Sequence, residues 1–115
     1  MCFVCSQGAP QQVIISGAIG DNAEFVNGSF LCVVDELYNG RALYQKVGDP
    51  NAWLRYLKDS TWAVTTTEDK VANNNVCKAY SVNMGMAFAT GESLWKVWVD
   101  GKWVEQEAVR VSPAV

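Results

Sequence analysis

The sequence contains no histidine. This absence excludes Ser-His-Asp and Cys-His catalysis, histidine-ligated metals and the commonest general base. The acidic pairs Asp35-Glu36 and Glu68-Asp69 are adjacent in sequence, and neighbours on a strand point to opposite faces, so neither pair supplies the facing carboxylates of a glycosidase. A phosphate-binding glycine motif is also missing. We therefore expect no catalytic residues and predict that the chain is not an enzyme.

Charge and long apolar runs are scarce as well. Charged residues make up 18% of the chain, the net charge is −3, and no two of the nine basic residues are adjacent. Nucleic-acid binding and membrane-surface binding both rely on clustered lysine and arginine. A transmembrane helix needs about 18 or more apolar residues in a row, and the sequence has no such stretch. We expect neither a nucleic-acid partner nor a membrane partner.

The N-terminus predicts the location of the protein, and the location in turn predicts the state of its four cysteines. Residues 1–5 lack the basic start and the long apolar run of an export signal, so we expect a cytoplasmic protein with reduced thiols. Cys2 and Cys5 have the spacing of a redox motif or of half a zinc site, with Cys32 and Cys77 as the other ligands. However, Cys32 and Cys77 lie in apolar segments, where a thiol packs as a small hydrophobe. We predict that both are buried and unpaired, with no metal and no cofactor.

What the sequence does contain is typical of strands and turns. Half of the residues are hydrophobic and 11% are aromatic, and Asn27-Gly28, Asn39-Gly40 and Asp100-Gly101 are hairpin-turn dipeptides. The pattern predicts strands at 12–17, 29–37, 42–47, 54–57, 61–67, 76–82, 93–99 and 102–111, and a helical turn at 49–54. The expected fold is all-β: an antiparallel meander of seven or eight short strands that forms a small barrel or a two-layer sandwich.

Length and composition predict a single domain. The 115 residues leave no room for two independent cores. We expect residues 12–111 to form this domain, residues 1–11 to form a flexible N-terminal tail and residues 112–115 to form a C-terminal tail. A polar connection is expected at 68–75 and a loop at 83–91.

The segment 94–106 gives the sharpest structural prediction. A type I′ turn at Asp100-Gly101 would pair Trp98 with Trp103 and Lys96 with Glu105 across two strands. Period two then places Trp95 on the core face and these four side chains on the solvent face. The register of the hairpin at Asn39-Gly40 is left undecided. A two-residue turn there would place Glu36 opposite Leu43 unless a bulge intervenes.

A recurring motif pattern runs through most of the chain. Its parts are Val26-Asn27-Gly28-Ser29-Phe30, then Asn39-Gly40-Arg41-Ala42-Leu43-Tyr44, then Trp53-Leu54-Arg55-Tyr56 and Trp62-Ala63-Val64. This resembles an uncharacterised all-β module, with the pattern VNG…NGRP…WLxY…WxV, that recurs in multidomain proteins of unicellular eukaryotes. The chain departs from the pattern at Phe30, where tyrosine is usual, and at Ala42, where proline is usual. The resemblance implies an all-β fold and no catalytic residues.

The five tryptophans supply the candidate site. Core packing accounts for Trp53, Trp62 and Trp95. The turn register places Trp98 and Trp103 on the polar face, where they either stabilise the hairpin or bind a partner.

We take Trp98, Trp103, Lys96 and Glu105 as the candidate binding residues. The function expected from them is a non-catalytic protein- or peptide-binding module whose partner is another protein, a peptide or a second copy of the chain. The alternative is a small-ligand or carbohydrate-binding β domain that uses the surface tryptophans.

Overall fold

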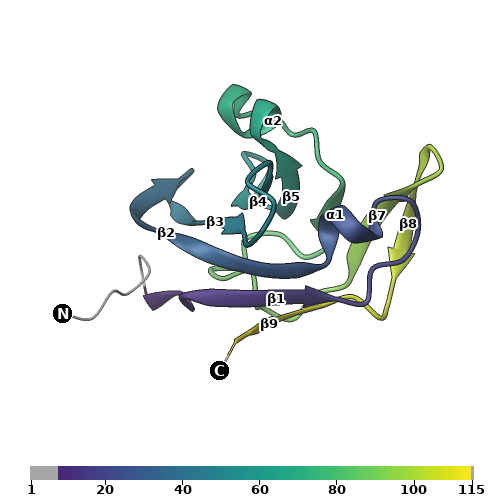
Figure 1. The fold of residues 1–115 in the computed structure, drawn as a ribbon, viewed down its shortest axis with the longest axis horizontal. Helices are drawn as coiled ribbons and strands as arrows, with labels where there is room; N and C mark the ends of the chain where they lie inside the picture. Colours follow the sequence, from purple (N-terminus) through teal and green to yellow (C-terminus); the bar gives the residue numbers. More distant parts are fainter. Residues whose placement is uncertain (1–7, 115) are drawn as a thin grey trace.

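The computed structural model describes residues 8–114, which form one antiparallel β-sheet and two short helices (Figure 1). The strands are β1 (Gln12–Ser16), β2 (Gly28–Tyr38), β3 (Arg41–Lys46), β4 (Ala52–Tyr56), β5 (Trp62–Thr66), β6 (Ala79–Ser81), β7 (Trp95–Val99), β8 (Lys102–Gln106) and β9 (Arg110–Pro113). Their order in the sheet is β8-β7-β6-β5-β4-β3-β2-β1-β9, and all paired neighbours are antiparallel. The prediction of an all-β antiparallel meander is confirmed.

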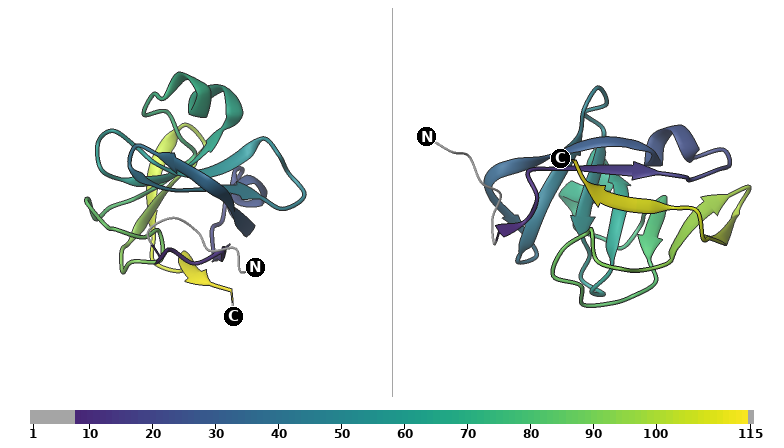
Figure 2. Two further views of the ribbon diagram at one scale, coloured as in Figure 1. Left: turned by 90° about the vertical axis from the view of Figure 1, so that its left-hand side faces the viewer. Right: turned by 90° about the horizontal axis from the view of Figure 1, so that it is seen from below.

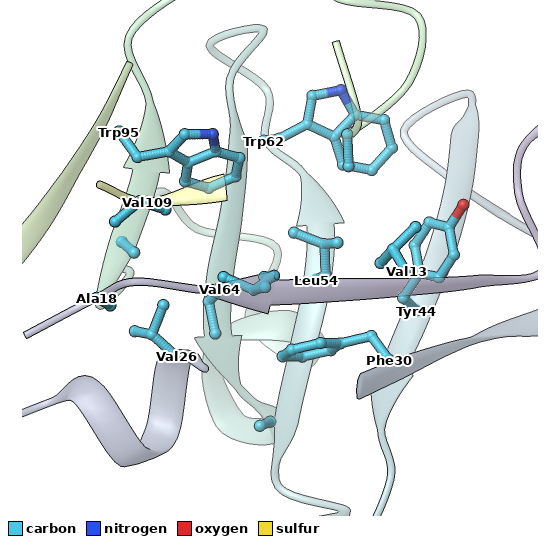
Figure 3. Close-up of a cluster of buried hydrophobic side chains, with 14 of the residues drawn as sticks. Val13, Ala18, Val26, Phe30, Tyr44, Leu54, Trp62, Val64, Trp95 and Val109 are labelled. Carbon is cyan, nitrogen blue, oxygen red and sulfur yellow. The ribbon is translucent and has the colours of Figure 1, made fainter. Parts of the chain in front are cut away.

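The sheet curls into a half-barrel, and its concave face holds the hydrophobic core (Figures 2 and 3). Alternate side chains of a strand share a face, so Leu54, Val64, Ala79 and Val97 meet in register across β4, β5, β6 and β7. All four are fully buried. Larger side chains fill the rest of the curl: Phe30, Tyr44, Trp62 and Trp95.

The first long connection ties the two ends of the sheet together. Residues 17–22 leave β1 and lie against β7 and β8, and α1 (Ala23–Val26) follows. The amide of Gln106 donates to the carbonyl of Ile19 (3.0 Å) and accepts from its N–H (2.9 Å). The amide of Asn27 bonds both main-chain groups of Ala18 in the same way. These two side chains satisfy the main-chain N–H and C=O groups of a connection that pairs with no strand. They therefore help to hold the curl closed.

The convex face of β3–β5 has its own cover. The helix α2 (Thr67–Ala72) begins at the N-cap Thr66, whose hydroxyl accepts a hydrogen bond from the N–H of Asp69, and ends at Asn73 in the left-handed conformation. Figure 1 shows α2 beside β4 and β5. Leu43 and Arg55 are fully buried beneath this cover.

Arg55 fixes the cover to the sheet. Its Nε donates to Oγ1 of Thr65 (2.7 Å), and an Nη donates to the carbonyl of Asn74 (2.9 Å). A second Nη lies near the hydroxyl of Tyr38. Burial lowers the pKa of Arg55, and all the acceptors named here are neutral. The guanidinium therefore acts as a hydrogen-bond hub that holds residues 73–76 on the convex face.

Both hairpin questions raised by the sequence are resolved. In β7–β8, Trp98 pairs with Trp103 and Lys96 with Glu105, and both Asp100 and Gly101 have positive φ. This confirms the predicted register and turn. In β2–β3 a two-residue turn is also present, but the register shifts between Cys32 and Leu37, with Asp35 at φ 63°. This bulge keeps Glu36 from pairing directly with Leu43.

Three local predictions are wrong. The strand expected at 102–111 is two strands, β8 and β9, separated by a turn at 107–109. The helical turn expected at 49–54 is a turn closed by the Asp49 carboxylate on the N–H of Asn51, and β4 begins at Ala52. The polar connection expected at 68–75 is mostly α2.

The described ends of the chain are partly built into the sheet. β9 runs to Pro113, so two residues of the expected C-terminal tail pair with β1. Of the expected N-terminal tail, Ala9 is buried and the carbonyl of Pro10 accepts from the hydroxyl of Tyr44 (2.7 Å). Residues 1–7 lie outside the described residues. No helix within 8–114 is long and apolar enough to span a bilayer.

The closed curl predicts a large difference between two glycine variants. Gly17 and Gly101 both have positive φ, but a Cβ at Gly17 would lie 2.0 Å from the carbonyl oxygen of Ala108, whereas a Cβ at Gly101 meets no atom within 4 Å. Gly17→Ala should therefore lower the free energy of unfolding by about 3 kcal/mol or more, and Gly101→Ala by about 1 kcal/mol. Urea unfolding measures both. Equal losses would show that the contact between 17 and 108 does not hold the curl.

Candidate functional site

The candidate binding residues lie together on the convex face, at the end of the sheet that α2 leaves uncovered. The rings of Trp98 and Trp103 meet edge to face with centroids 5.1 Å apart, and Tyr80 meets Trp103 at 4.8 Å. Trp98 and Tyr80 are half-buried, while Trp103 is 38% exposed. The three rings brace one another and leave one ring open to a partner.

Lys96 and Glu105 lie beside these rings. Tyr80, Lys96 and Glu105 are direct neighbours across β6, β7 and β8. Lys96 is half-buried and Glu105 is exposed. We call the five residues Tyr80, Lys96, Trp98, Trp103 and Glu105 the outer hairpin face. The structure thus brings together all four residues that the sequence singled out.

The main chain of β8 adds a feature that composition does not reveal. The N–H of Trp98 donates to the carbonyl of Lys78 (2.9 Å), the residue directly before β6. The main-chain groups of successive residues alternate between the two sides of a strand, so those of its cross-strand neighbour Trp103 point away from β7. The same alternation applies to Glu105. Trp103 and Glu105 therefore present their N–H and C=O groups along the outer edge of β8, which pairs with no other strand within residues 8–114 and is called the open edge below.

The other end of the sheet is different. The N–H of Ala114 donates to the carbonyl of Gln12 on β1, so by alternation the main chains of Val111 and Pro113 face the open edge of β9. Proline has no N–H to offer, and proline at an edge position is a common protection against strand addition. The β9 edge is thus blunted at Pro113, whereas β8 has no proline.

An exposed apolar residue also lies beside β8 on the concave side. Ile19 is 70% exposed, and Gln106 of β8 holds both of its main-chain hydrogen-bonding groups. The open edge is therefore flanked by Trp103 on one face of the sheet and by Ile19 near the other. Scattered apolar residues are common on surfaces, but two beside one unpaired edge suit a contact with another chain.

The outer hairpin face lies outside the two main hollows of the described residues. One hollow of about 860 Å³ lies between the loop 82–94 and β9, and its lining includes Asn83, Glu92 and Arg110. A second, of about 700 Å³, lies beside α1 and includes Lys46 and Asp49. Neither is lined by Trp98 or Trp103. The two tryptophans therefore contribute to neither hollow.

The remaining tryptophans divide in a way that the sequence did not show. Trp62 and Trp95 are buried in the core, as predicted. Trp53 is half-buried on the convex face, where its Nε1 donates to Oγ1 of Thr67 (2.9 Å) and the Lys70 ammonium lies 4.3 Å from its ring centroid. Trp53 therefore holds the start of α2 and is absent from the concave core.

The prediction for the cysteines is wrong for Cys32 and partly right for Cys77. Cys32 is disulfide-bonded. Cys77 has a free thiol, but it is half-buried and not fully buried. An apolar strand context does not distinguish a packed thiol from a bonded one, which explains the error at Cys32. Cys2 and Cys5, which have the spacing of a redox motif or of half a zinc site, lie outside the described residues.

Sequence reasoning missed two residues of the site. Tyr80 lies in a predicted strand, but the long loop after β6 hides which β7 residue is its neighbour. Ile19 lies in a connection that only the Gln106 contact places beside β8. Its exposed apolar side chain in a glycine-rich turn is the one signal that the sequence offered.

Comparison with known proteins adds no assignment. No protein-family model, curated protein or solved structure matches the chain. The resemblance to the VNG…NGRP…WLxY…WxV module stays a prediction.

The environment of Cys77 predicts an unreactive thiol. Burial raises the pKa of Cys77 from 9.0 to about 12, against a smaller lowering by Arg55. At pH 8 only about one molecule in ten thousand then carries the thiolate, so alkylation of Cys77 should be about a thousandfold slower in the folded than in the unfolded chain. Mass spectrometry of timed iodoacetamide reactions, with and without urea, measures this ratio. Equal alkylation rates in the folded and the unfolded chain would contradict the burial of the Cys77 thiol.

The same pKa shift predicts a pH dependence of stability. The unfolded chain ionises this thiol near pH 9 and the folded chain near pH 12. The contribution of the neutral thiol is therefore fully present below about pH 9 and is lost as the pH rises toward 12. Cys77→Ala should remove this part of the alkaline loss, as measured by urea unfolding across that range. An unchanged pH profile would contradict it.

Proposed function

We propose that this chain is a non-catalytic interaction module that binds an extended segment of a protein partner along β8. The observation that carries the proposal is that Trp103 and Glu105 face the open edge with their main chains and line the outer hairpin face with their side chains. A segment added there would gain main-chain hydrogen bonds and a contact on the exposed ring of Trp103. In strand addition the first supplies affinity and the second supplies specificity.

The rigidity of the surface supports this function. The edge-to-face contacts of Trp103 with Trp98 and Tyr80 fix its ring before a partner arrives. Gln106 and the turn at Asp100-Gly101 fix the two ends of β8. Because the surface is already ordered, binding costs less conformational entropy. Tryptophans held in this way are common at the centres of binding hot spots.

The alternative function is carbohydrate binding by the same face. A sugar ring can stack on an exposed indole, and 38% of Trp103 is accessible. The position of this face outside both hollows favours a long partner over a small enclosed ligand. Stacking also makes no use of the open main chain of β8. Strand addition accounts for the position outside the hollows and also uses the open main chain of β8, so we prefer it.

The cytoplasmic location stays a prediction, and the disulfide at Cys32 argues against it. That location was expected because residues 1–5 lack the pattern of an export signal, and reduced thiols were expected to follow from it. Disulfides persist mainly in oxidising compartments, and Cys32 is disulfide-bonded.

The proposal is tested with short random peptides selected from a displayed library for binding to the folded chain. Glu105→Pro removes an outward N–H without breaking a bond to β7, whereas Glu105→Ala keeps that N–H and removes only the side chain. A selected peptide should bind Glu105→Pro at least about tenfold more weakly than the wild type, and Glu105→Ala within about twofold. Fluorescence anisotropy of labelled peptides measures both affinities, and thermal unfolding checks that both variants fold.

A second pair of variants tests the role of the tryptophan ring. Trp103→Ala loses the contacts with Trp98 and Tyr80, so stability should fall by about 1–3 kcal/mol. Peptide affinity per folded molecule should also fall at least about tenfold. Trp53→Ala is the matched control, because Trp53 packs against α2; it should lower stability and leave affinity unchanged. The proposal fails if the library yields no binder, or if binders ignore both Glu105→Pro and Trp103→Ala.

The carbohydrate alternative gives a different result with the same variants. A glycan that stacks on the ring should lose affinity for Trp103→Ala and keep it for Glu105→Pro, because it needs no main-chain donor. Screening a glycan array with the wild type and these two variants distinguishes the two functions.

A further inference from the structure

We infer that β8 also pairs with β8 of a second copy of this chain, antiparallel and with a two-fold axis through Val104. This inference rests on the same open edge as the proposed function and names one occupant of it. It differs in that the partner strand is known, so its register and side-chain contacts can be derived residue by residue.

The main-chain geometry allows few registers. Trp103 and Glu105 are the β8 residues that face outward, so they must bond to the outward residues of the copy. A two-fold axis can then lie at Trp103, Val104 or Glu105. The axis at Glu105 sets two carboxylates directly opposite each other, which is unfavourable. The axis at Trp103 leaves Glu105 and Gln106 opposite the turn of the copy. The axis at Val104 pairs all five residues of β8.

In the Val104 register the strands form a complete antiparallel ladder. Trp103 of one copy exchanges both main-chain hydrogen bonds with Glu105 of the other, and the symmetry repeats this pair, which gives four bonds in all. Val104 meets its own copy as the closely spaced, non-hydrogen-bonded pair. The main-chain groups left open at the edge of β8 are thereby satisfied.

The side chains are compatible in this register. On the concave side, half-buried Val104 contacts Val104, and exposed Lys102 lies opposite Gln106. On the convex side, Glu105 of one copy lies opposite Trp103 of the other. Within its own copy, Glu105 is the neighbour of Lys96 on β7. No like charges are directly opposed, which is the main requirement for one edge to accept its own copy.

The register also continues the aromatic surface from one copy to the next. The two Trp103 side chains become diagonal neighbours, about 7–8 Å apart at Cα, a distance that aromatic side chains can span. Each is already braced by Trp98 and Tyr80 of its own chain. The two outer hairpin faces would thus join into one aromatic strip across the two-fold axis.

The contact is limited to one five-residue strand on each side, so it belongs with weak, transient interfaces. Such a dimer would dissociate when an extended partner segment competes for the edge. Self-pairing then protects an exposed strand while the partner is absent, a problem that open sheet edges pose to most β proteins.

Engineered cysteines test the register. In this dimer the two Val104 Cα atoms lie about 4.5 Å apart, within the range of a disulfide, whereas the two Glu105 Cα atoms lie about 7–8 Å apart, at or beyond its limit. Val104→Cys should therefore form a covalent dimer in a glutathione redox buffer, at least about five times more of it than Glu105→Cys or the wild type. Non-reducing gel electrophoresis measures the fractions. Equal fractions for all three proteins would overturn the register.

Sedimentation at protein concentrations up to about 1 mM tests the association itself. The wild type and Glu105→Ala should show a dimer fraction that rises with concentration, and Glu105→Pro should remain monomeric. A monomeric wild type that also fails to cross-link would overturn this inference, and peptide binding at β8 would leave the proposed function standing. Self-association without any peptide binder would overturn the proposed function and leave the second copy as the occupant.

Discussion

The fold depends on two amide side chains that order the connection between β1 and β2, and one of them, Gln106, joins this connection to the far end of the sheet. Asn27 holds Ala18, and Gln106 holds Ile19, through both main-chain groups in each case. Without these bonds, the main-chain groups of buried Ala18 would lose their partners, and the connection would lose its side-chain link to β8. With them, β8 is anchored from its concave side and its outer edge stays unpaired. The same interaction therefore closes the core and presents the candidate binding edge.

Much of the fold could be predicted from local sequence because its hairpins are short. Asp100-Gly101 fixes the β7–β8 register, and period two then places Trp98 and Trp103 on the convex face. These predictions need only a turn type and a two-residue period, which are properties of neighbouring residues. The candidate site was predictable to the same extent, because most of it lies on one hairpin.

The errors occur where distant residues decide the local structure. The turn between β8 and β9 brings the carbonyl of Ala108 so close to Gly17 that a Cβ there would lie 2.0 Å from its oxygen. Arg55 lies in a strand and is buried because residues 73–76 supply carbonyl acceptors to it. The helix α2, which directly precedes these residues, is thereby placed over the strand. The position of Ile19 beside β8 likewise depends on a residue far away in sequence, Gln106. A turn dipeptide or a periodicity carries no information about such contacts.

The central claim is that the edge of β8 is open and faces outward through Trp103 and Glu105. Amide hydrogen exchange of the isolated chain, measured residue by residue by NMR at low protein concentration, tests it most directly. The N–H groups of Val104 and Gln106 face β7 and should exchange slowly. Those of Trp103 and Glu105 should exchange at rates close to those of an unfolded chain. Slow exchange at all four residues in the monomer would show that the chain itself covers the edge and would contradict the account.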